Sequence, residues 1–301
     1  MEPKIAHIKN EALSTLLHRA ALILCCAILA IVLFSNFLER WLLARMYPAI
    51  WEKLSNGNNE RRRRSFTYLH IGVFIMALLI IFGAYPVFRF LLRDVRLSSM
   101  LFENTTYGDY MLVLSQIYSA YYLFEVCFRT RFASAISIAH HAGLLIVIQT
   151  ALALFGDLRK HPEAILEFYM CMVWGAFDVI VELPLYTFMI IWRVKCNDHR
   201  LLSRMAYACC VWVMLGATTE TAITIWLLKR SWSRWGLSCR ILLPLVFSLW
   251  ISTQLYGAYR IYCMARSKAQ LASPRDEEQQ SPGYGQVLGG GNNNLVARPK
   301  A

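Results

Sequence analysis

The chain has 301 residues, 57% of them hydrophobic, and a mean hydropathy of +0.41. This apolar share exceeds that of soluble domains, so composition excludes an ordinary soluble protein and indicates a polytopic helical membrane protein. The net charge of +12 does not require a nucleic-acid partner, because Lys and Arg concentrate in cytosolic loops of membrane proteins. The nine cysteines predict no disulfide framework, because most lie in apolar runs, where a free thiol behaves as a small hydrophobe.

Seven apolar runs, each close to or above the roughly 20 residues that cross a bilayer, predict an all-α protein of about seven transmembrane helices. In chain order they cover residues 20–38, 66–92, 110–128, 133–155, 164–186, 205–228 and 239–263. The first run lacks a small-residue cleavage site, so we expect a retained span rather than a removed signal peptide. Pro86 lies near the end of the second run and predicts a bend or an interfacial last turn.

The segments outside the spans are polar. Residues 1–19 are expected to form a short lumenal segment, and residues 20–65 the first span with a basic cytosolic loop. The four arginines at 61–64 favour a solvated anchor at the membrane surface, with anionic-lipid binding or a retention signal as alternatives. Residues 66–266 hold the other six spans. Residues 267–301 are rich in Ser, Pro, Gly and Asn, so we expect a disordered cytosolic tail.

The distribution of positive charge predicts the orientation. With seven spans, the side that holds the N-terminus carries 12 Lys and Arg residues and the opposite side carries 19. Because the richer side is cytosolic, we expect a lumenal N-terminus and a cytosolic tail. The sequon at Asn104 then lies in a lumenal loop, as glycosylation requires.

Two neighbouring spans carry ionisable groups at membrane depth, where such groups are costly and usually functional. The span 133–155 contains the pair His140 and His141, and the span 164–186 contains Asp178 and Glu182. A short polar link makes these spans antiparallel. His140 then lies roughly 10 Å from one helix end and Asp178 roughly 12 Å from the adjacent end of the other. This matched depth predicts an acid/base site.

The His-His pair followed by Asp-x-x-x-Glu resembles the TLC-domain family, which includes the ceramide synthases. The Tyr-rich segment YSAYYLFEVCFR and the final span ending YRIYCMAR agree with it. The resemblance implies that residues 66–266 form a six-helix barrel of two inverted three-helix repeats, with the first span outside. It also implies a cavity at the depth of the His and Asp residues.

The acidic motif departs from that of the ceramide synthases, whose second helix reads His-Asp-x-x-Asp-x-x-x-Glu. If Asp178 and Glu182 are its last two acids, Trp174 and Gly175 stand in place of His-Asp. If Asp178 is its first acid, Val181 replaces the second. We therefore do not expect a ceramide synthase.

Each candidate residue also has a structural interpretation. Either histidine could bond a neighbouring helix, Asp178 could clamp two helices together, and Glu182 could be a solvated residue near a helix end. Glu125 favours an interfacial ion pair with Arg129, four residues later. Other polar residues in the spans are candidates for lining a substrate cavity together with Glu182: Trp174, Gln149, Glu220 and, more weakly, Gln254.

Two classes of function remain open. The first is an enzyme of lipid metabolism that transfers an acyl group to a lipid amine or hydroxyl, with His140 or His141 as base or acyl carrier and Asp178 orienting it. Acyl-CoA would be its co-substrate, without another cofactor. The second is a non-catalytic protein that binds or transports lipid, or regulates membrane composition, using the same cavity.

Location and partners follow from the same observations. We expect a multi-pass protein of the endoplasmic reticulum, with membrane lipids as partners and a homo-oligomer allowed. No metal is expected, because membrane hydroxylases and desaturases need several separated His clusters and the other five histidines occur singly.

Overall fold

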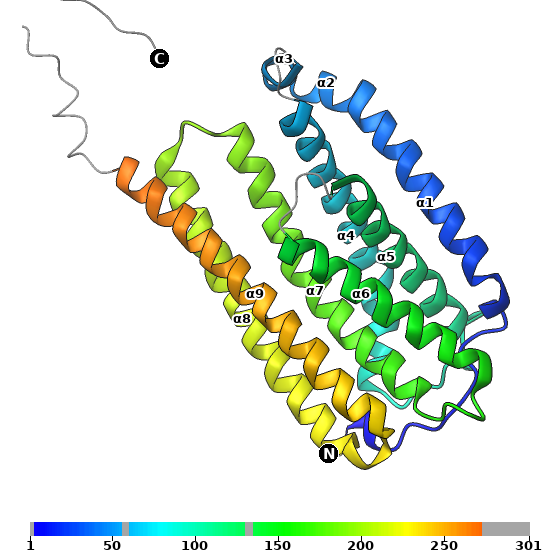
Figure 1. The fold of residues 1–301 in the computed structure, drawn as a ribbon. Helices are drawn as coiled ribbons and strands as arrows, with labels where there is room; N and C mark the ends of the chain where they lie inside the picture. Colours follow the sequence, from blue (N-terminus) through cyan, green and yellow to red (C-terminus); the bar gives the residue numbers. More distant parts are fainter. Residues whose placement is uncertain (1–2, 56–59, 130–134, 273–301) are drawn as a thin grey trace, which may run out of the picture.

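The computed structural model describes residues 3–55, 60–129 and 135–272 and confirms the expected fold class (Figure 1). The protein is all-α apart from one short hairpin, and seven helices of its described part are long and apolar enough to cross a membrane. It is thus a polytopic helical membrane protein. The tail was predicted to cover residues 267–301. Residues 267–271 belong instead to the last helix, and residues from 273 onward lie outside the described part.

Five of the seven long helices contain their predicted spans and extend beyond them, and the bounds of the other two lie within two residues of the predicted ones. They are α1 (Ala20–Phe37), α4 (Glu60–Leu92), α5 (Tyr107–Arg129), α6 (Ala135–Leu154), α7 (Ala164–Val194), α8 (His199–Ser231) and α9 (Leu237–Leu271). A π-helical turn, η3 (Leu38–Leu42), and α2 (Leu43–Met46) prolong α1. Pro86 lies within α4, which continues to Leu92, so the proline does not end the helix.

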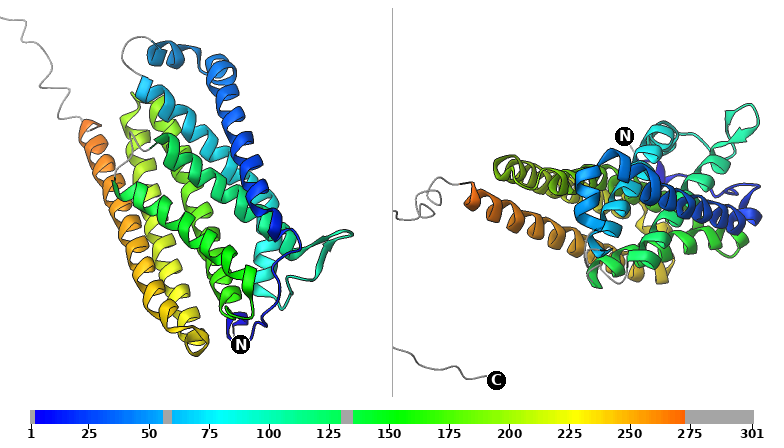
Figure 2. Two further views of the ribbon diagram at one scale, coloured as in Figure 1. Left: turned by 45° about the vertical axis from the view of Figure 1, so that its right-hand side comes forward. Right: turned by 90° about the horizontal axis from the view of Figure 1, so that it is seen from above.

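Six helices contact one another in a ring, in the order α4, α5, α6, α9, α8 and α7, and α6 also contacts α7 across it. The helix α1 packs against α5 on the outside (Figures 1 and 2), as expected for a first span outside the others. The helices α8 and α9 form a long antiparallel pair on the opposite side. The inverted repeats remain a prediction.

The basic segment after the first span is more helical than a loop. It contains α3 (Pro48–Ser55), and the four arginines belong to the first turns of α4. Arg63 pairs with Glu39 at 3.1 Å, and Arg64 pairs with Glu60 at 2.6 Å. The pair of Arg64 with Glu60, four residues earlier, and the pair of Arg63 with Glu39 of η3 stabilise the polar first turns of α4.

The N-terminal segment, expected to be a short lumenal segment, is packed against the bundle. Ile5, Ile8 and Leu13 are buried. The Lys4 ammonium donates to the carbonyls of Phe90 and Val95 at 2.7 and 2.6 Å. Burial lowers the pKa of Lys4 from 10.5 to about 8, although Asp94 and Glu11 oppose the shift.

Two further contacts hold this segment across the end of the bundle. The Arg234 guanidinium donates to the carbonyls of Ile5 and Ile8 at 2.7 and 2.5 Å. A Cβ on Gly108, in the first turn of α5, would collide with the Leu13 carbonyl. Glycine therefore permits the close approach of the segment to the helix.

The predicted sequon lies in a β-hairpin beside the same end of the bundle. Strands β1 (Met100–Phe102) and β2 (Thr105–Thr106) pair antiparallel, and Asn104 lies exposed between them. The orientation that would place this hairpin in the lumen remains a prediction.

Candidate functional site

The histidines and acids that the sequence analysis singled out lie together at one polar cavity of about 230 Å³. Its walls come from α6, α7, α8 and α9, and include His140, His141, Asp178 and Glu182. Within α6 the two histidines are adjacent, and their rings lie 5.3 Å apart at a steep angle. The helix α6 packs against both α7 and α9, so the histidine pair lies close to these two helices.

The hydrogen bonds of Thr253, on α9, determine the tautomer of His140. The Thr253 hydroxyl donates its proton to the Trp250 carbonyl at 2.7 Å. Its oxygen lies 2.9 Å from His140 Nδ1, so it accepts the proton that Nδ1 donates. In neutral His140, Nε2 therefore carries the lone pair, and it lies 3.7 Å from Asp178 Oδ1.

His140 also lies against an aromatic surface. Its ring centroid is 4.1 Å from that of Trp250, with the planes tilted by 36°. An imidazolium at this position would be stabilised by the indole face as well as by Asp178.

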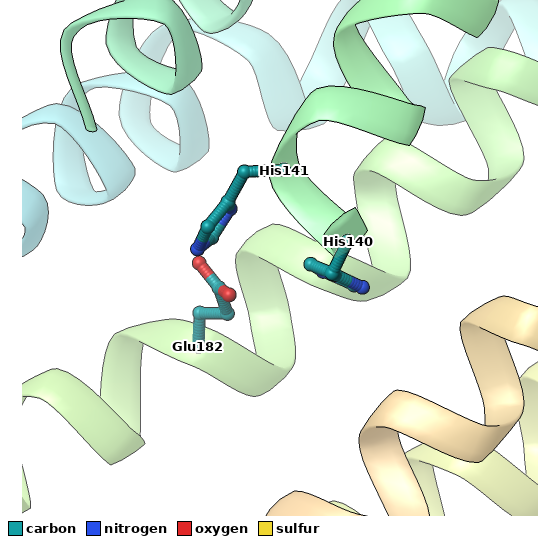
Figure 3. Close-up of side chains that lie close together, drawn as sticks. All are labelled: His140, His141 and Glu182. Atoms are coloured by element: carbon teal, nitrogen blue, oxygen red, sulfur yellow. The ribbon is translucent and has the colours of Figure 1, made fainter. Parts of the chain in front are cut away.

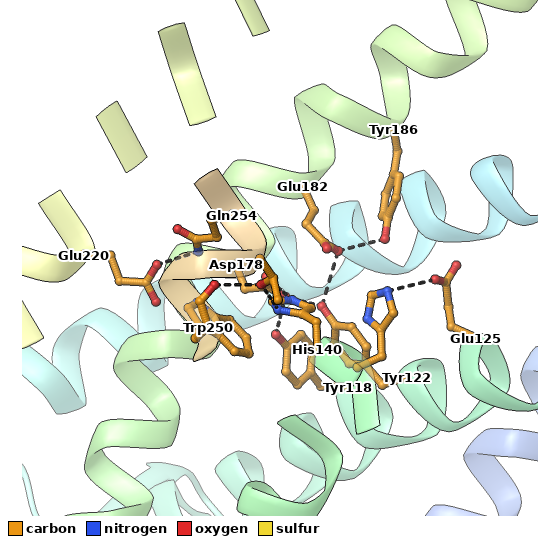
Figure 4. Close-up of polar contacts among 12 residues, drawn as sticks. Tyr118, Tyr122, Glu125, His140, Asp178, Glu182, Tyr186, Glu220, Trp250 and Gln254 are labelled. Carbon is orange, nitrogen blue, oxygen red and sulfur yellow. Dashed lines mark hydrogen bonds and ion pairs between the residues drawn. The ribbon is translucent and has the colours of Figure 1, made fainter. Parts of the chain in front are cut away.

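The carboxylate of Asp178 is buried and held by two tyrosines of α5. Tyr118 donates to Oδ2 at 2.6 Å, and Tyr122 donates to the same oxygen. Oδ1 remains directed at His140 (Figure 4). Hydrogen bonds from fixed hydroxyls partly replace the water that a carboxylate loses at membrane depth.

Glu182 lies one turn after Asp178 and shares a tyrosine with it. Its Oε2 accepts from Tyr186 at 2.8 Å and lies 3.3 Å from the Tyr122 hydroxyl. Tyr122 has one proton, and its shorter contact is with Asp178. The side chain thus takes part in the buried polar cluster rather than being a fully solvated helix-end residue.

His141 is paired with an acid that the sequence analysis interpreted differently. Its Nε2 lies 3.5 Å from Glu125 Oε2, and Glu125 Oε1 accepts from Tyr121 at 3.2 Å. Glu125 is only 4% exposed. The expected interfacial pair with Arg129 stays a prediction, because the Arg129 side chain lies outside the described residues.

The signal that could have identified this role is a spacing within α5. Tyr118, Tyr122 and Glu125 follow at four- and three-residue intervals and share one helix face. A polar stripe of this kind in a transmembrane helix usually faces a polar partner. Thr253 carried no comparable signal, because isolated Thr residues often bond their own helix backbone.

Three of the four remaining predicted lining residues lie outside the lining of the polar cavity. The Trp174 indole donates to Thr224 at 3.1 Å and stacks on Phe247. Gln149 donates to Ser119 at 2.9 Å. Among the described residues that line the polar cavity, Trp174, Gln149 and Glu220 do not appear, whereas Gln254 does and donates to Glu220 at 2.8 Å.

An apolar cavity of about 140 Å³ lies on the other side of Tyr118. It is formed by α4, α5, α6 and α7, and its lining includes Leu79, Gly83, Ile148 and Gly175. Tyr118 contributes to this lining while its hydroxyl bonds Asp178. Tyr118 thus contacts both the apolar cavity and the polar cluster.

Comparisons of the chain with models of protein families, with curated proteins and with solved structures found no match. The resemblance to the TLC-domain family therefore depends on the His-His and Asp-x-x-x-Glu residues themselves. What the structure shows is a multi-pass helical membrane protein with a buried His/carboxylate/Tyr cluster between its helices.

Proposed function

We propose that the chain is an acyltransferase of membrane lipids, which transfers an acyl group from a thioester such as acyl-CoA to a lipid amine or hydroxyl. The observation that carries the proposal is the placement of His140, whose Nδ1 contacts Thr253 and whose Nε2 lies beside the buried Asp178 carboxylate at the polar cavity. The resemblance to the TLC-domain family supports the same reaction, and membership of that family and an endoplasmic-reticulum location form part of the proposal.

In this reaction His140 is the general base. As the lipid amine or hydroxyl attacks the thioester carbonyl carbon, its proton passes to His140 Nε2. Asp178, 3.7 Å away, stabilises the imidazolium. The tetrahedral intermediate then expels the thiolate by breaking the C–S bond, and the proton passes from His140 to the sulfur. The imidazole is thereby restored.

The apolar cavity supports a lipid as substrate. A hydrocarbon chain in that cavity lies next to Tyr118, and Tyr118 contacts the Asp178 carboxylate. The reacting group of the same molecule would then be directed toward the polar cluster. Apolar walls with a few convergent polar groups are the usual composition of a small-molecule site.

The test is acyl transfer by the purified chain in lipid nanodiscs, with a long-chain acyl-CoA and a mixture of lipid amines and alcohols. Product analysis by mass spectrometry would identify the acceptor. His140→Ala and Asp178→Asn should each abolish most of the transfer, and the double variant should lose little more, because the two residues act as one unit. Additive losses, or full activity in both single variants, would contradict the proposal.

The apolar cavity also favours a second function, in which the chain binds a lipid without reacting with it. In that case a bound lipid would copurify with the wild type and with His140→Ala alike, and Gly83→Leu would expel it by filling the cavity. The absence of any acyl product in the same samples would then select lipid binding over catalysis.

A further inference from the structure

The polar cluster brings carboxylates and imidazoles together. Glu125, Asp178 and Glu182 provide three carboxylates, and His140 and His141 provide two imidazoles. Arg260 also lines the cavity, where it is exposed and contacts Tyr256. Carboxylate and imidazole are both ligands of divalent transition metals, so this cluster offers the donor set of a metal site.

Three of these side chains converge in a way that suits a metal ion. His140, His141 and Glu182 each offer a ligand atom, and these atoms lie within 4.8 Å of one another. Figure 3 shows the three side chains gathered between α6 and α7. A tetrahedral site with bonds of about 2.0–2.1 Å has ligand atoms roughly 3.4 Å apart, so binding requires the trio to close by up to about 1.4 Å.

The residues around the trio are those that commonly support metal ligands. A ligating histidine usually donates its other ring proton to a fixed acceptor, and His140 Nδ1 donates to Thr253. A ligating carboxylate is usually hydrogen-bonded in turn, and Glu182 accepts from Tyr186. His140 is therefore positioned with a free Nε2 lone pair before any ion arrives.

We propose that His140, His141 and Glu182 bind a divalent transition metal, with zinc as the best match. Imidazole and carboxylate are ligands that zinc prefers, and four-coordinate zinc tolerates a site with three protein ligands and one open position. No metal was expected, because the other histidines are scattered singly along the chain. Glu182, however, reaches the His pair from another helix.

This inference does not depend on acyl transfer. Zinc would occupy the Nε2 lone pair that the proposed base requires, so the metal-bound form would not transfer acyl groups by that route. Zinc binding is measured without substrate, and transfer is measured in the presence of a chelator. Each proposal can therefore fail while the other stands.

The experiment uses the full chain, purified in detergent, stripped with EDTA and titrated with zinc by calorimetry. Wild type should bind one zinc per chain. Glu182→Gln, which keeps a hydrogen-bond acceptor for Tyr186, and His141→Ala should weaken binding by more than the roughly 10–100-fold expected for a supporting residue such as Thr253 in Thr253→Val.

Two controls separate this site from adventitious binding. Glu220→Gln removes a buried carboxylate on α8 that is outside the trio, and should leave the affinity unchanged. Cys239→Ser tests the rival group near Glu167, where the thiol donates to the carboxylate at 2.9 Å. Cobalt bound in place of zinc should show visible bands without a sulfur charge-transfer band.

The proposal is overturned if wild type binds no zinc, or if folded Glu182→Gln and His141→Ala bind it as tightly as wild type. Thermal melting of each variant establishes folding. A sulfur charge-transfer band that disappears in Cys239→Ser would assign the metal to the rival group and would equally overturn the proposal.

Discussion

The chemistry of the candidate site depends on which nitrogen of His140 carries a proton. Thr253 donates its own hydroxyl proton to the Trp250 carbonyl, so its oxygen accepts a proton from His140 Nδ1. A general base with the lone pair on Nδ1 would direct it toward α9 and away from Asp178. One hydroxyl on a neighbouring helix thus selects the reactive nitrogen of the histidine.

Replacing Thr253 tests this dependence. Thr253→Val keeps the shape but removes the acceptor for Nδ1, and we expect kcat for acyl transfer to fall about 10–100-fold with little change in KM. Thr253→Ser should restore most of the activity. Ser252→Ala is the matched control, because exposed Ser252 bonds only the Ser248 carbonyl of its own helix.

The pH profile of the same variants distinguishes positioning from loss of folding. A destabilised protein would lose activity equally at every pH, whereas a changed tautomer preference should shift the acidic limb of the profile for Thr253→Val relative to Thr253→Ser. Identical profiles with identical rates would contradict a positioning role.

The candidate site could be predicted only in part from the sequence. The adjacency of His140 and His141 and the matched depth of Asp178 were sufficient to predict that they meet, because depth in a bilayer constrains which residues can touch. To predict that the tyrosine donors and Glu125 belong to the site, one must know how α5 is rotated about its axis. The spacing of these residues indicates that they share a helix face, but it does not identify the neighbouring helices that this face contacts.

Among the helices, close packing depends on a few glycines. A Cβ on Gly216, in α8, would collide with the side chain of Val181, in α7. Val181 also lines the polar cavity. The contact between α7 and α8 therefore requires a residue without a side chain at position 216, as is common where transmembrane helices approach closely.

Gly216→Ala should consequently lower the free energy of unfolding by about 1–3 kcal/mol, the usual range for overpacking. Gly257→Ala in α9 is the control, because a Cβ there meets nothing within 4 Å. Alanine at that position should be neutral or stabilising by up to ~1 kcal/mol through helix propensity. Thermal unfolding in one detergent would measure both, and equal melting temperatures would contradict the packing argument.

Helix limits were predictable where apolar runs define them and less so where they continue into water. The helix α7 extends to Val194, beyond the predicted end at 186, and α9 extends to Leu271. The basic start of α4 was expected to be a loop. Inside the bilayer the backbone must form its hydrogen bonds within the helix. Outside the bilayer, salt bridges and helix-favouring residues can prolong the helix.

For the whole molecule, the charge asymmetry predicts a lumenal N-terminus and a cytosolic C-terminus. Protease added to sealed microsomes should then remove an epitope tag fused after Gly291 and spare one fused at Met1. Detergent should expose both tags and serves as the control. Protection of the C-terminal tag with loss of the N-terminal one would reverse the orientation and move Asn104 to the cytosol.

The buried Lys4 gives the whole fold a pH dependence. Its pKa is lowered from 10.5 to about 8 by burial, so the folded state binds this proton more weakly than the unfolded state. Stability should therefore rise with pH between about 8 and 10.5 and show no such gain below 8. Melting temperatures of wild type should increase relative to Lys4→Met across that window. A constant difference would contradict the shift.

The contacts of Arg234 with Ile5 and Ile8 also constrain how the protein matures. Ile5 and Ile8 bind a side chain that is synthesised more than 200 residues after them. At about 5–20 residues per second, the N-terminal segment waits on the order of ten seconds or longer for its partner. Its docking is consequently one of the last steps of assembly, and it occurs only in a chain whose first six spans have already been made.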